Sequence, residues 1–167
     1  LRGAFQKMAR LVRDLSKDCG KIVKFATQGE ETEIDKNVVD KIGDPLMHMM
    51  RNAIDHAIES PEERVAAGKS RQGLVTLRAF HKGGNVYIEI EDDGRGLDRQ
   101  AIVAKALERG LLRESDSLSD AEVWNLIFLP GFSTAKTITD VSGRGVGMDV
   151  VKRSISALRG HVEIRSQ

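Results

Sequence analysis

Residues 44–59 read Asp44-Pro-Leu-Met-His-Met-Met-Arg-Asn-Ala-Ile-Asp-His-Ala-Ile-Glu59, and the organisation of the rest of the chain follows from this stretch. Asp44 is a favourable N-cap residue, and Pro45 suits the first helical position because its missing N–H would have no partner there. The pair Ser60-Pro61 predicts the end of the helix, since the residue before a proline is disfavoured in helical conformation. We therefore expect a helix over residues 44–59.

Two stripes of side chains follow this helix at helical spacing. The apolar stripe, which predicts the buried face, consists of Met47, Met50, Ile54, Ala57 and Ile58. The polar stripe consists of His48, Asn52, Asp55 or His56, and Glu59. Imidazole, carboxamide and carboxylate groups bind metal ions or exchange protons, whereas a solvated face usually carries Lys and Glu. A functional face is one interpretation, and an ordinary polar outer face is the alternative.

Composition places the chain among ordinary soluble globular proteins. Of its 167 residues 40% are hydrophobic and 31% are charged, which predicts a single domain with a sizeable core. The net charge of +1 comes from 26 basic and 25 acidic residues and argues against nucleic acid or a membrane surface as partner. One cysteine excludes an internal disulfide. Because no apolar run approaches the ~20 residues of a membrane span and the first residues do not resemble a signal peptide, we expect a cytoplasmic protein.

Periodicity and turn residues predict the other elements. We expect an amphipathic helix over residues 1–18, which begins without a cap and would lead in from a preceding domain. The remaining expected elements are a strand over 21–28, brief helices over 37–42 and 61–68, a hairpin over 74–91 that turns at 83–85, helices over 98–109, 119–128 and 148–158, and a strand over 161–165. Residues 129–147 show no periodicity, which is typical of a functional lid or of a disordered segment, and we expect a lid here. The order predicts an α+β fold, a two-layer sandwich with helices on one face of a mixed, mostly antiparallel sheet.

Three glycine-containing segments could bind phosphate or a base. Gly68-Lys69-Ser70 is not a P-loop, because Glu63 occupies the position of the first glycine of that motif. Residues 143–147 read Gly-Arg-Gly-Val-Gly and do not match a dinucleotide fingerprint. Their backbone N–H groups could nevertheless approach an anion at the start of the next helix, whose dipole favours negative charge. A plain loop before a helix is the alternative.

Residues 92–96 read Asp-Asp-Gly-Arg-Gly and follow the second hairpin strand. They lack the alternating acids of a calcium loop. An acid at the end of a buried strand, followed by glycines that let a flat ring lie close, suits recognition of the exocyclic amine of adenine. An ordinary Asp-Gly turn is the alternative.

Four motifs in this order resemble a known family. They are His48-Met-Met-Arg-Asn-Ala-Ile-Asp-His56, Asp92-Asp-Gly-Arg-Gly-Leu97, Pro130-Gly-Phe-Ser-Thr134 and Val141-Ser-Gly-Arg-Gly-Val-Gly-Met-Asp-Val-Val151. They resemble the conserved boxes of the histidine kinase, gyrase and Hsp90 ATPase superfamily, and within it the ATP-binding catalytic domains of chemotaxis histidine kinases of the CheA type. The resemblance runs from about residue 13 to residue 167 and implies the Bergerat-type ATP-binding fold.

The resemblance also implies roles for individual residues. Asn52 would coordinate Mg²⁺ between the phosphates, Asp92 would accept the adenine amino hydrogen, and His48 and His56 would stand near the γ-phosphate. The implied catalytic residues are His48, Asn52 and His56. The implied ATP-binding residues are Asn52, Asp55, Asp92, Gly94, Gly96, Ser133, Thr134, Lys136, Gly143, Arg144, Gly145, Val146, Gly147 and Met148. Residues 130–145 would form a lid over the triphosphate.

Two functions remain open at this point. ATP-hydrolysing members of the superfamily carry Glu four positions before the Asn, where this chain has His48. The missing carboxylate favours transfer of the γ-phosphoryl group to an incoming imidazole, by positioning and charge neutralisation, over attack by water. The alternative is a nucleotide-binding regulatory module without chemistry of its own.

The resemblance further implies partners that lie outside this chain. The acceptor would be a histidine phosphotransfer domain of the same kinase, reached in trans, and the full-length protein would be a homodimer with receptor and adaptor partners. The family continues past a strand like residues 161–165 into a last sheet strand, which this sequence lacks.

Overall fold

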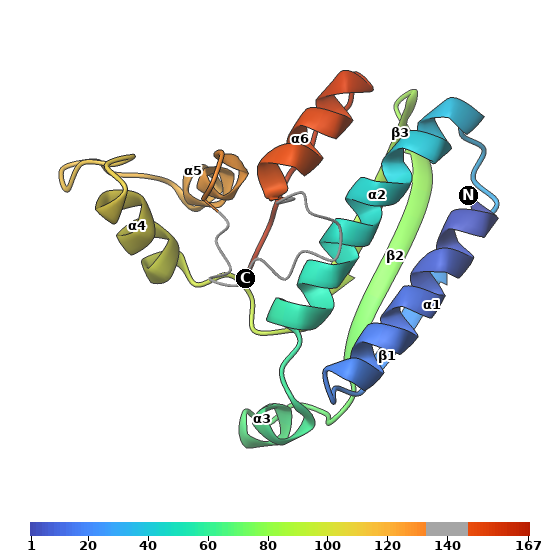
Figure 1. Cartoon of the computed structure of the whole chain (residues 1–167), viewed down its shortest axis with the longest axis horizontal. Coiled ribbons are helices and arrows are strands. Elements are labelled where there is room, and N and C mark those ends of the chain that lie inside the picture. The colour runs from blue at the N-terminus through green and yellow to red at the C-terminus, as the bar shows by residue number, and fades with distance from the viewer. Residues whose placement is uncertain (133–146) are drawn as a thin grey trace. The chain divides into compact units, whose positions relative to one another are not determined.

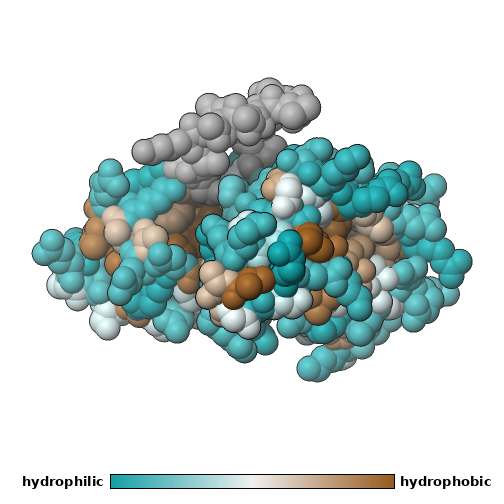
Figure 2. All heavy atoms as spheres, turned by 90° about the horizontal axis from the view of Figure 1, so that it is seen from below, coloured by the Kyte–Doolittle hydropathy of each residue, from teal (hydrophilic) through white to brown (hydrophobic). Residues whose placement is uncertain are grey.

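The computed structural model describes residues 1–132 and 147–167, which form two compact units, residues 1–96 and residues 97–167 (Figure 1). None of the described helices is long and apolar enough to cross a membrane. On the face shown in Figure 2, hydrophobic residues form small separate areas among hydrophilic ones.

The first unit contains a three-stranded mixed sheet. Its strands are β1 (Val23–Gln28), β2 (Gly73–Lys82) and β3 (Asn85–Asp92), in the order β1-β2-β3. β1 pairs with β2 in parallel, and β2 pairs with β3 antiparallel from Lys82↔Asn85 to Val75↔Asp92. Gly83 and Gly84 form the two-residue turn, with φ of 57° and 79°. These left-handed values suit glycine and match the twist of a hairpin. The predicted hairpin is therefore confirmed.

Two long helices, α1 (Arg2–Asp18) and α2 (Lys36–Asn52), lie side by side on one face of this sheet (Figure 1). The core between helices and sheet consists of Phe5, Met8, Val12, Ile42, Leu46, Met50, Val75, Leu77 and Ala79, all buried. Burying one large apolar side chain contributes roughly 1.5–3 kcal/mol, so this layer is the main source of stability of the unit. The other face of the sheet is partly exposed and carries the stacked rings of Phe80 and Tyr87, whose centroids lie 5.3 Å apart.

The central helix begins earlier than the sequence predicts. Its N-cap is Asp35, whose side chain accepts a hydrogen bond of 2.8 Å from the backbone N–H of Asn37. The brief helix expected over residues 37–42 and the helix expected from residue 44 are one continuous α2, so the assignment of Asp44 as N-cap is wrong. Pro45 lies inside α2 and is buried. An interior proline costs about 3 kcal/mol, and burial of Ile42, Pro45 and Leu46 against the core offsets it.

A π-helical turn, Ala53–Ala57, follows α2 directly. The N–H of Ile58 donates to the carbonyl of Ala53, five residues earlier, at 2.9 Å. The wider turn lets Ile54 and Ile58 both reach the core at 0% exposure. The predicted apolar stripe is wrong at Met47, which is 37% exposed, because the earlier start and the π turn change which residues face the sheet. Ser60 then caps α3 (Pro61–Ala66), the predicted short helix.

The second unit is helical in its described part, with α4 (Arg99–Glu108), α5 (Asp120–Asn125), a 3₁₀ turn (Leu126–Phe128) and α6 (Met148–Ala157). Asp98 and Ser119 are N-caps for α4 and α5, and Ser119 forms a capping box with Glu122. The buried apolar residues are Ala106, Val123, Trp124, Phe128, Phe132, Met148 and Val151. The predicted helices are confirmed, and the α+β class is confirmed for the chain.

The strand predicted over residues 161–165 is wrong, because residues 160–167 have no regular secondary structure. An extended segment becomes a strand only when its backbone pairs with another, and the described part of this unit offers no strand as partner. α6 ends with Arg159 in the left-handed region at φ 59°, rather than with the glycine that follows it. The N–H of Gly160 closes the helix by donating to the carbonyl of Ile155 at 2.9 Å.

Candidate functional site: a loop against the end of the central helix

In the first unit, the loop that follows β3 packs against the end of the π turn. The N–H of Arg95 donates to the carbonyl of Ala57 at 2.9 Å. A Cβ added to Gly94 would lie 2.2 Å from the Ala57 oxygen, so only glycine allows this approach. The segment of Asp92 and Gly94 therefore meets the end of the helical segment that follows Asn52.

Four charged residues hold this loop in place, and we call them the Arg64 cluster: Glu59, Arg64, Lys69 and Asp93. Arg64 is 1% exposed and donates to Oε1 of Glu59 at 3.1 Å and to Oδ2 of Asp93 at 2.9 Å. Lys69 donates to Oε2 of Glu59 at 2.8 Å and to the carbonyl of Gly94 at 2.8 Å. Burial alone would raise the pKa of Glu59, but the hydrogen bond from Lys69 and the charges of Lys69 and Arg64 lower it.

The Arg64 cluster shows the structural roles of two residues, Glu59 and Lys69, to which the sequence assigned no definite role. Glu59, placed on the polar stripe, is buried and ion-paired rather than part of a solvated face. Lys69, which follows Gly68 in the rejected P-loop-like triplet, binds a carboxylate and a loop carbonyl. Arg64 and Asp93 were missed as site residues. No local sequence pattern predicts that an arginine is buried, because the residues that pair with it come from segments far apart in the chain.

Asp92 ends β3 and turns back toward the loop. Its Oδ1 accepts the N–H of Gly94 at 2.9 Å. The pKa of Asp92 is raised by desolvation and by the nearby Asp93 and Glu59, while the Gly94 hydrogen bond acts in the opposite direction. The expectation of a buried strand is wrong: β3 is exposed along its length apart from half-buried Ile88 and Ile90. The acid is therefore accessible at the sheet edge.

Four predicted polar residues lie on α2 and the π turn. His48 is half-buried, and its Nε2 is buried without a hydrogen-bond partner among the described residues. Burial lowers the pKa of His48, and the nearby Arg51 and His56 lower it further, so the ring is neutral at pH 7. A neutral imidazole with an unpaired nitrogen can bind a ligand atom or a water molecule.

Asn52 is the last residue of α2 and is partly exposed where the π turn begins. Oδ1 of Asp55 accepts the S–H of Cys19 at 3.2 Å. Lys21 donates to the carbonyls of Ile54 and Asp55 at 2.6 and 2.8 Å. His56 is exposed. π turns within helices occur often at functional sites. Here the turn begins directly after Asn52 and ends at Ala57, whose carbonyl accepts the N–H of Arg95 in the loop after β3.

In the second unit, the described part of the predicted phosphate-binding segment is Gly147 and Met148. Gly147 is the extended N-cap of α6, and Met148 is buried as the first helical residue. A Cβ on Gly147 would lie 2.6 Å from Oδ1 of Asp149, which itself pairs with Arg153 at 3.2 Å. The helix thus begins where the glycine run predicts. The other predicted residues lie outside the described residues: Ser133, Thr134, Lys136, Gly143, Arg144, Gly145 and Val146.

The motifs and these positions agree with a known family. The model of the family described as histidine kinase-, DNA gyrase B-, and HSP90-like ATPase matches residues 41–167. The chain belongs to this family. The match begins within α2 and includes the loop after β3 and α6.

Curated relatives narrow the comparison within the ATPase family. The chain is 53% identical over 167 residues to the chemotaxis protein CheA of Rhizobium meliloti, covering 100% of this chain and 22% of that protein. It is 56% identical over 163 residues to CheA of Klebsiella aerogenes, covering 98% and 25%. The sensor histidine kinase CheAY of Helicobacter pylori is 52% identical over 165 residues, covering 98% and 20%. The chain thus spans about a quarter or less of the length of these relatives.

The aromatic residue of the third motif, Phe132, packs against two cations that the sequence did not indicate as site residues. Nζ of Lys105 and the guanidinium of Arg109 lie 5.3 and 5.9 Å from the ring centroid of Phe132. Arg109 also donates to the carbonyl of Gly131. Such cation–π contacts fix the chain at the start of the motif. The spacing of Lys105 and Arg109, one helical turn apart, is the signal that indicates their shared face.

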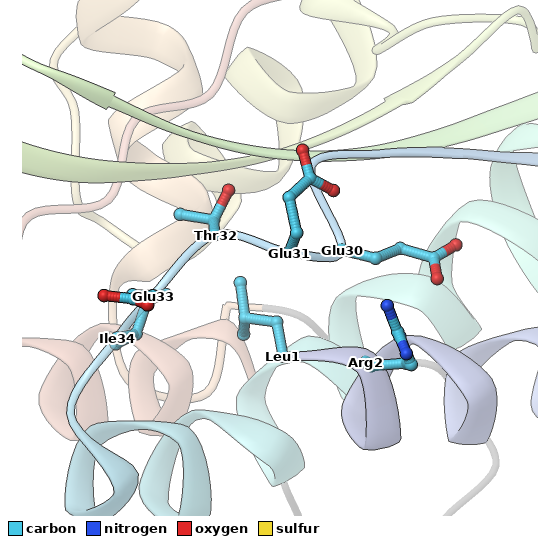
Figure 3. Close-up of a pocket in the computed structure, with 7 residues that line it drawn as sticks. All are labelled: Leu1, Arg2, Glu30, Glu31, Thr32, Glu33 and Ile34. Atoms are coloured by element: carbon cyan, nitrogen blue, oxygen red, sulfur yellow. The ribbon is translucent and has the colours of Figure 1, made fainter.

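A separate hollow of about 560 Å³ lies between the start of α1 and the loop after β1 (Figure 3). The described residues that line it are Leu1, Arg2, Glu30, Glu31, Thr32, Glu33 and Ile34. None of these is a predicted site residue of the ATPase family. The hollow is therefore separate from the candidate site residues.

Proposed function

We propose that this chain is the ATP-binding catalytic domain of a chemotaxis histidine kinase, and that it transfers the γ-phosphoryl group of ATP to a histidine on a separate phosphotransfer domain. Family membership and the curated relatives support this proposal. The observation that carries it is His48: four residues before Asn52, its buried Nε2 has no partner among the described residues, and the ring is neutral.

The described residues fit a Mg²⁺–nucleotide complex better than a protein-held metal ion. Among them there is no group of three or more His, Cys, Asp or Glu side chains that could hold a metal. Mg²⁺ commonly takes one or two protein oxygens and completes its shell with phosphates and water. The carboxamide oxygen of Asn52 would supply such a ligand. Bound there, Mg²⁺ would neutralise charge on the phosphates.

The remaining roles follow from the positions of the side chains. Asp92 would accept the adenine amino hydrogen, with Gly94 and Gly96 alongside the base. His48 would orient or deprotonate the attacking group, and His56 would stand near the γ-phosphate. Asp55 and the predicted ATP-binding residues between 133 and 148 would complete the nucleotide site. The chain has no carboxylate four positions before Asn52 to activate a water molecule, so transfer to an incoming imidazole nitrogen is favoured over hydrolysis.

The acceptor is proposed to come from outside this chain. The four histidines are His48, His56, His81 and His161. His48 and His56 belong to the candidate site, and His81 lies at the end of a hairpin strand. His161 lies in the terminal segment without regular structure. Neither His81 nor His161 lies in a helix, where an acidic neighbour could orient an imidazole as nucleophile. For the full-length protein we propose a cytoplasmic homodimer with receptor and adaptor partners.

Labelling with [γ-³²P]ATP and Mg²⁺ tests this function. The purified chain alone should remain unlabelled, and an added phosphotransfer domain of a chemotaxis kinase should acquire acid-labile, base-stable label. A phosphotransfer domain whose acceptor histidine is replaced by glutamine is the control. Label on the lone chain would contradict transfer in trans, and phosphate release without any labelled partner would contradict the kinase function.

A further inference from the structure

The Arg64 cluster contains the two charged side chains that are buried among the described residues, Arg64 and Glu59. Arg64 lies in α3 at 1% exposure, and Glu59 is 7% exposed. A buried ion pair is seldom retained for stability, because apolar side chains of similar volume often serve as well or better. Its value is more often that it selects one arrangement of the chain. The contacts of this cluster show which arrangement is selected.

The cations of the cluster bind two consecutive carbonyl groups of the loop after β3. Arg64 and Lys69 each donate to the carbonyl of Asp93 at 3.2 Å, and Lys69 donates to the carbonyl of Gly94 at 2.8 Å. These hydrogen bonds therefore fix the orientation of both peptide groups through their carbonyl oxygens. Because a peptide unit is planar, fixing the carbonyl of Asp93 also fixes the direction of the N–H of Gly94.

That N–H is the group that binds Asp92. It donates to Oδ1 of Asp92 at 2.9 Å. The side chain of Asp93 is held as well, since its Oδ1 accepts the N–H of Leu74 at 2.8 Å and its Oδ2 accepts Arg64 at 2.9 Å. The series of contacts runs from the buried guanidinium, through one peptide plane, to the carboxylate of Asp92.

We propose that the Arg64 cluster is a positioning device that sets the orientation of Asp92 and thereby the preference of this site for adenine over guanine nucleotides. The inference rests on the proposed function, because it takes Asp92 as the group that meets the base. A carboxylate discriminates between an amino group and a carbonyl only when its direction is fixed, since a free rotor can turn away from an unfavourable partner.

Two substitutions of opposite charge test this role. Asp93→Asn removes a negative charge and the ion pair with Arg64, and Lys69→Met removes a positive charge and the bond to Gly94. Lys69 is 34% exposed at its side chain, so this variant leaves no buried void and should fold even if the first does not. Glu91→Gln and Lys82→Met are the matched controls, because each makes the same charge change on the same hairpin without touching the cluster.

Calorimetric titrations with ATP, GTP and inorganic tripolyphosphate give the readout. We expect both test variants to bind ATP about tenfold more weakly, with GTP and tripolyphosphate affinities within about twofold of wild type, so that the ATP-to-GTP preference falls about tenfold. The controls should keep the wild-type preference. Because the two test variants change net charge in opposite directions, a shared effect cannot come from long-range electrostatics.

Three other outcomes would refute the positioning role, and one of them would also refute the proposed function. If the wild type prefers ATP and both variants retain that preference, the positioning role is refuted while the proposed function stands. An equal loss of ATP and GTP binding would likewise refute it, since the cluster would then only support the fold. A wild type that binds no ATP would refute the proposed function and this inference with it.

Discussion

Gly94→Ala is the substitution that places a new side-chain atom directly against the backbone at the candidate site. The new Cβ would lie 2.2 Å from the carbonyl oxygen of Ala57, 2.5 Å from its carbon and 2.9 Å from Oδ1 of Asp92. Ordinary carbon–oxygen contacts are longer by about 1 Å or more, so the loop has to move away from the helix end. The atoms in the way are backbone, which cannot turn aside as a flexible side chain could.

The movement breaks two hydrogen bonds as well as the packing. The bonds are those from Arg95 to Ala57 and from Gly94 to Asp92, both 2.9 Å long. Overpacking of this kind and the loss of two hydrogen bonds together lower the free energy of unfolding by about 2–4 kcal/mol. Since Asp92 loses its orientation, ATP affinity should also fall by about tenfold or more.

Gly43→Ala is the matched control for this substitution. Gly43 lies inside α2, in the same unit, and a Cβ there would meet nothing within 4 Å. Alanine in a helix interior is favoured over glycine by about 0.5–1 kcal/mol, so this variant should be more stable than wild type.

Urea unfolding followed by circular dichroism measures stability, and calorimetric titration measures ATP affinity. The two alanine variants should shift the unfolding midpoint in opposite directions, and only Gly94→Ala should weaken ATP binding. If Gly94→Ala is as stable as wild type and binds ATP equally well, the close approach of the loop to the helix end is not required, and the geometric argument for the site is refuted.

Three further predictions address other parts of the chain. Asn52→Ala should abolish the effect of Mg²⁺ on ATP affinity, as measured by titration with and without Mg²⁺; an unchanged Mg²⁺ effect would contradict the role of Asn52. The pKa of His48 is lower in the folded than in the unfolded protein, so on acidification the unfolded chain binds a proton at His48 first. The free energy of unfolding should therefore fall as the pH drops below about 6.5, the ordinary pKa of histidine, toward the pKa of His48 in the folded protein. His48→Gln should lose this part of the pH dependence in urea unfolding, and parallel pH curves for the two proteins would speak against it. Arg159→Gly should raise the free energy of unfolding by about 0.5–1 kcal/mol, because Arg159 ends α6 at φ 59°, where an L-residue is strained. A lower unfolding midpoint for this variant would show that its side-chain contacts outweigh the strain.

Local patterns in the sequence were sufficient to predict most of the helices and strands and to indicate the ATPase family. The hairpin follows from alternating residues on either side of Gly83-Gly84, and the capped helices α3, α4 and α5 follow from Ser60, Asp98 and Ser119. These signals act between residues close in the chain, where propensity and capping decide the conformation. The four ordered motifs indicated the ATPase family that the comparison confirmed.

Tertiary structure decided the features that depend on residues distant in the chain. Pro45 reads locally as a helix start, yet α2 continues through it because its buried face packs on α1 and the sheet. The π turn at Ala53–Ala57 and the Arg64 cluster exist only where α3, the helix end and the loop after β3 meet. Residues 161–165 have the composition of a strand but no partner in the described part of their unit, so they do not form one. Burial, ion pairing and strand pairing are long-range interactions, and a single sequence records which residues are able to make them but not which residues will meet.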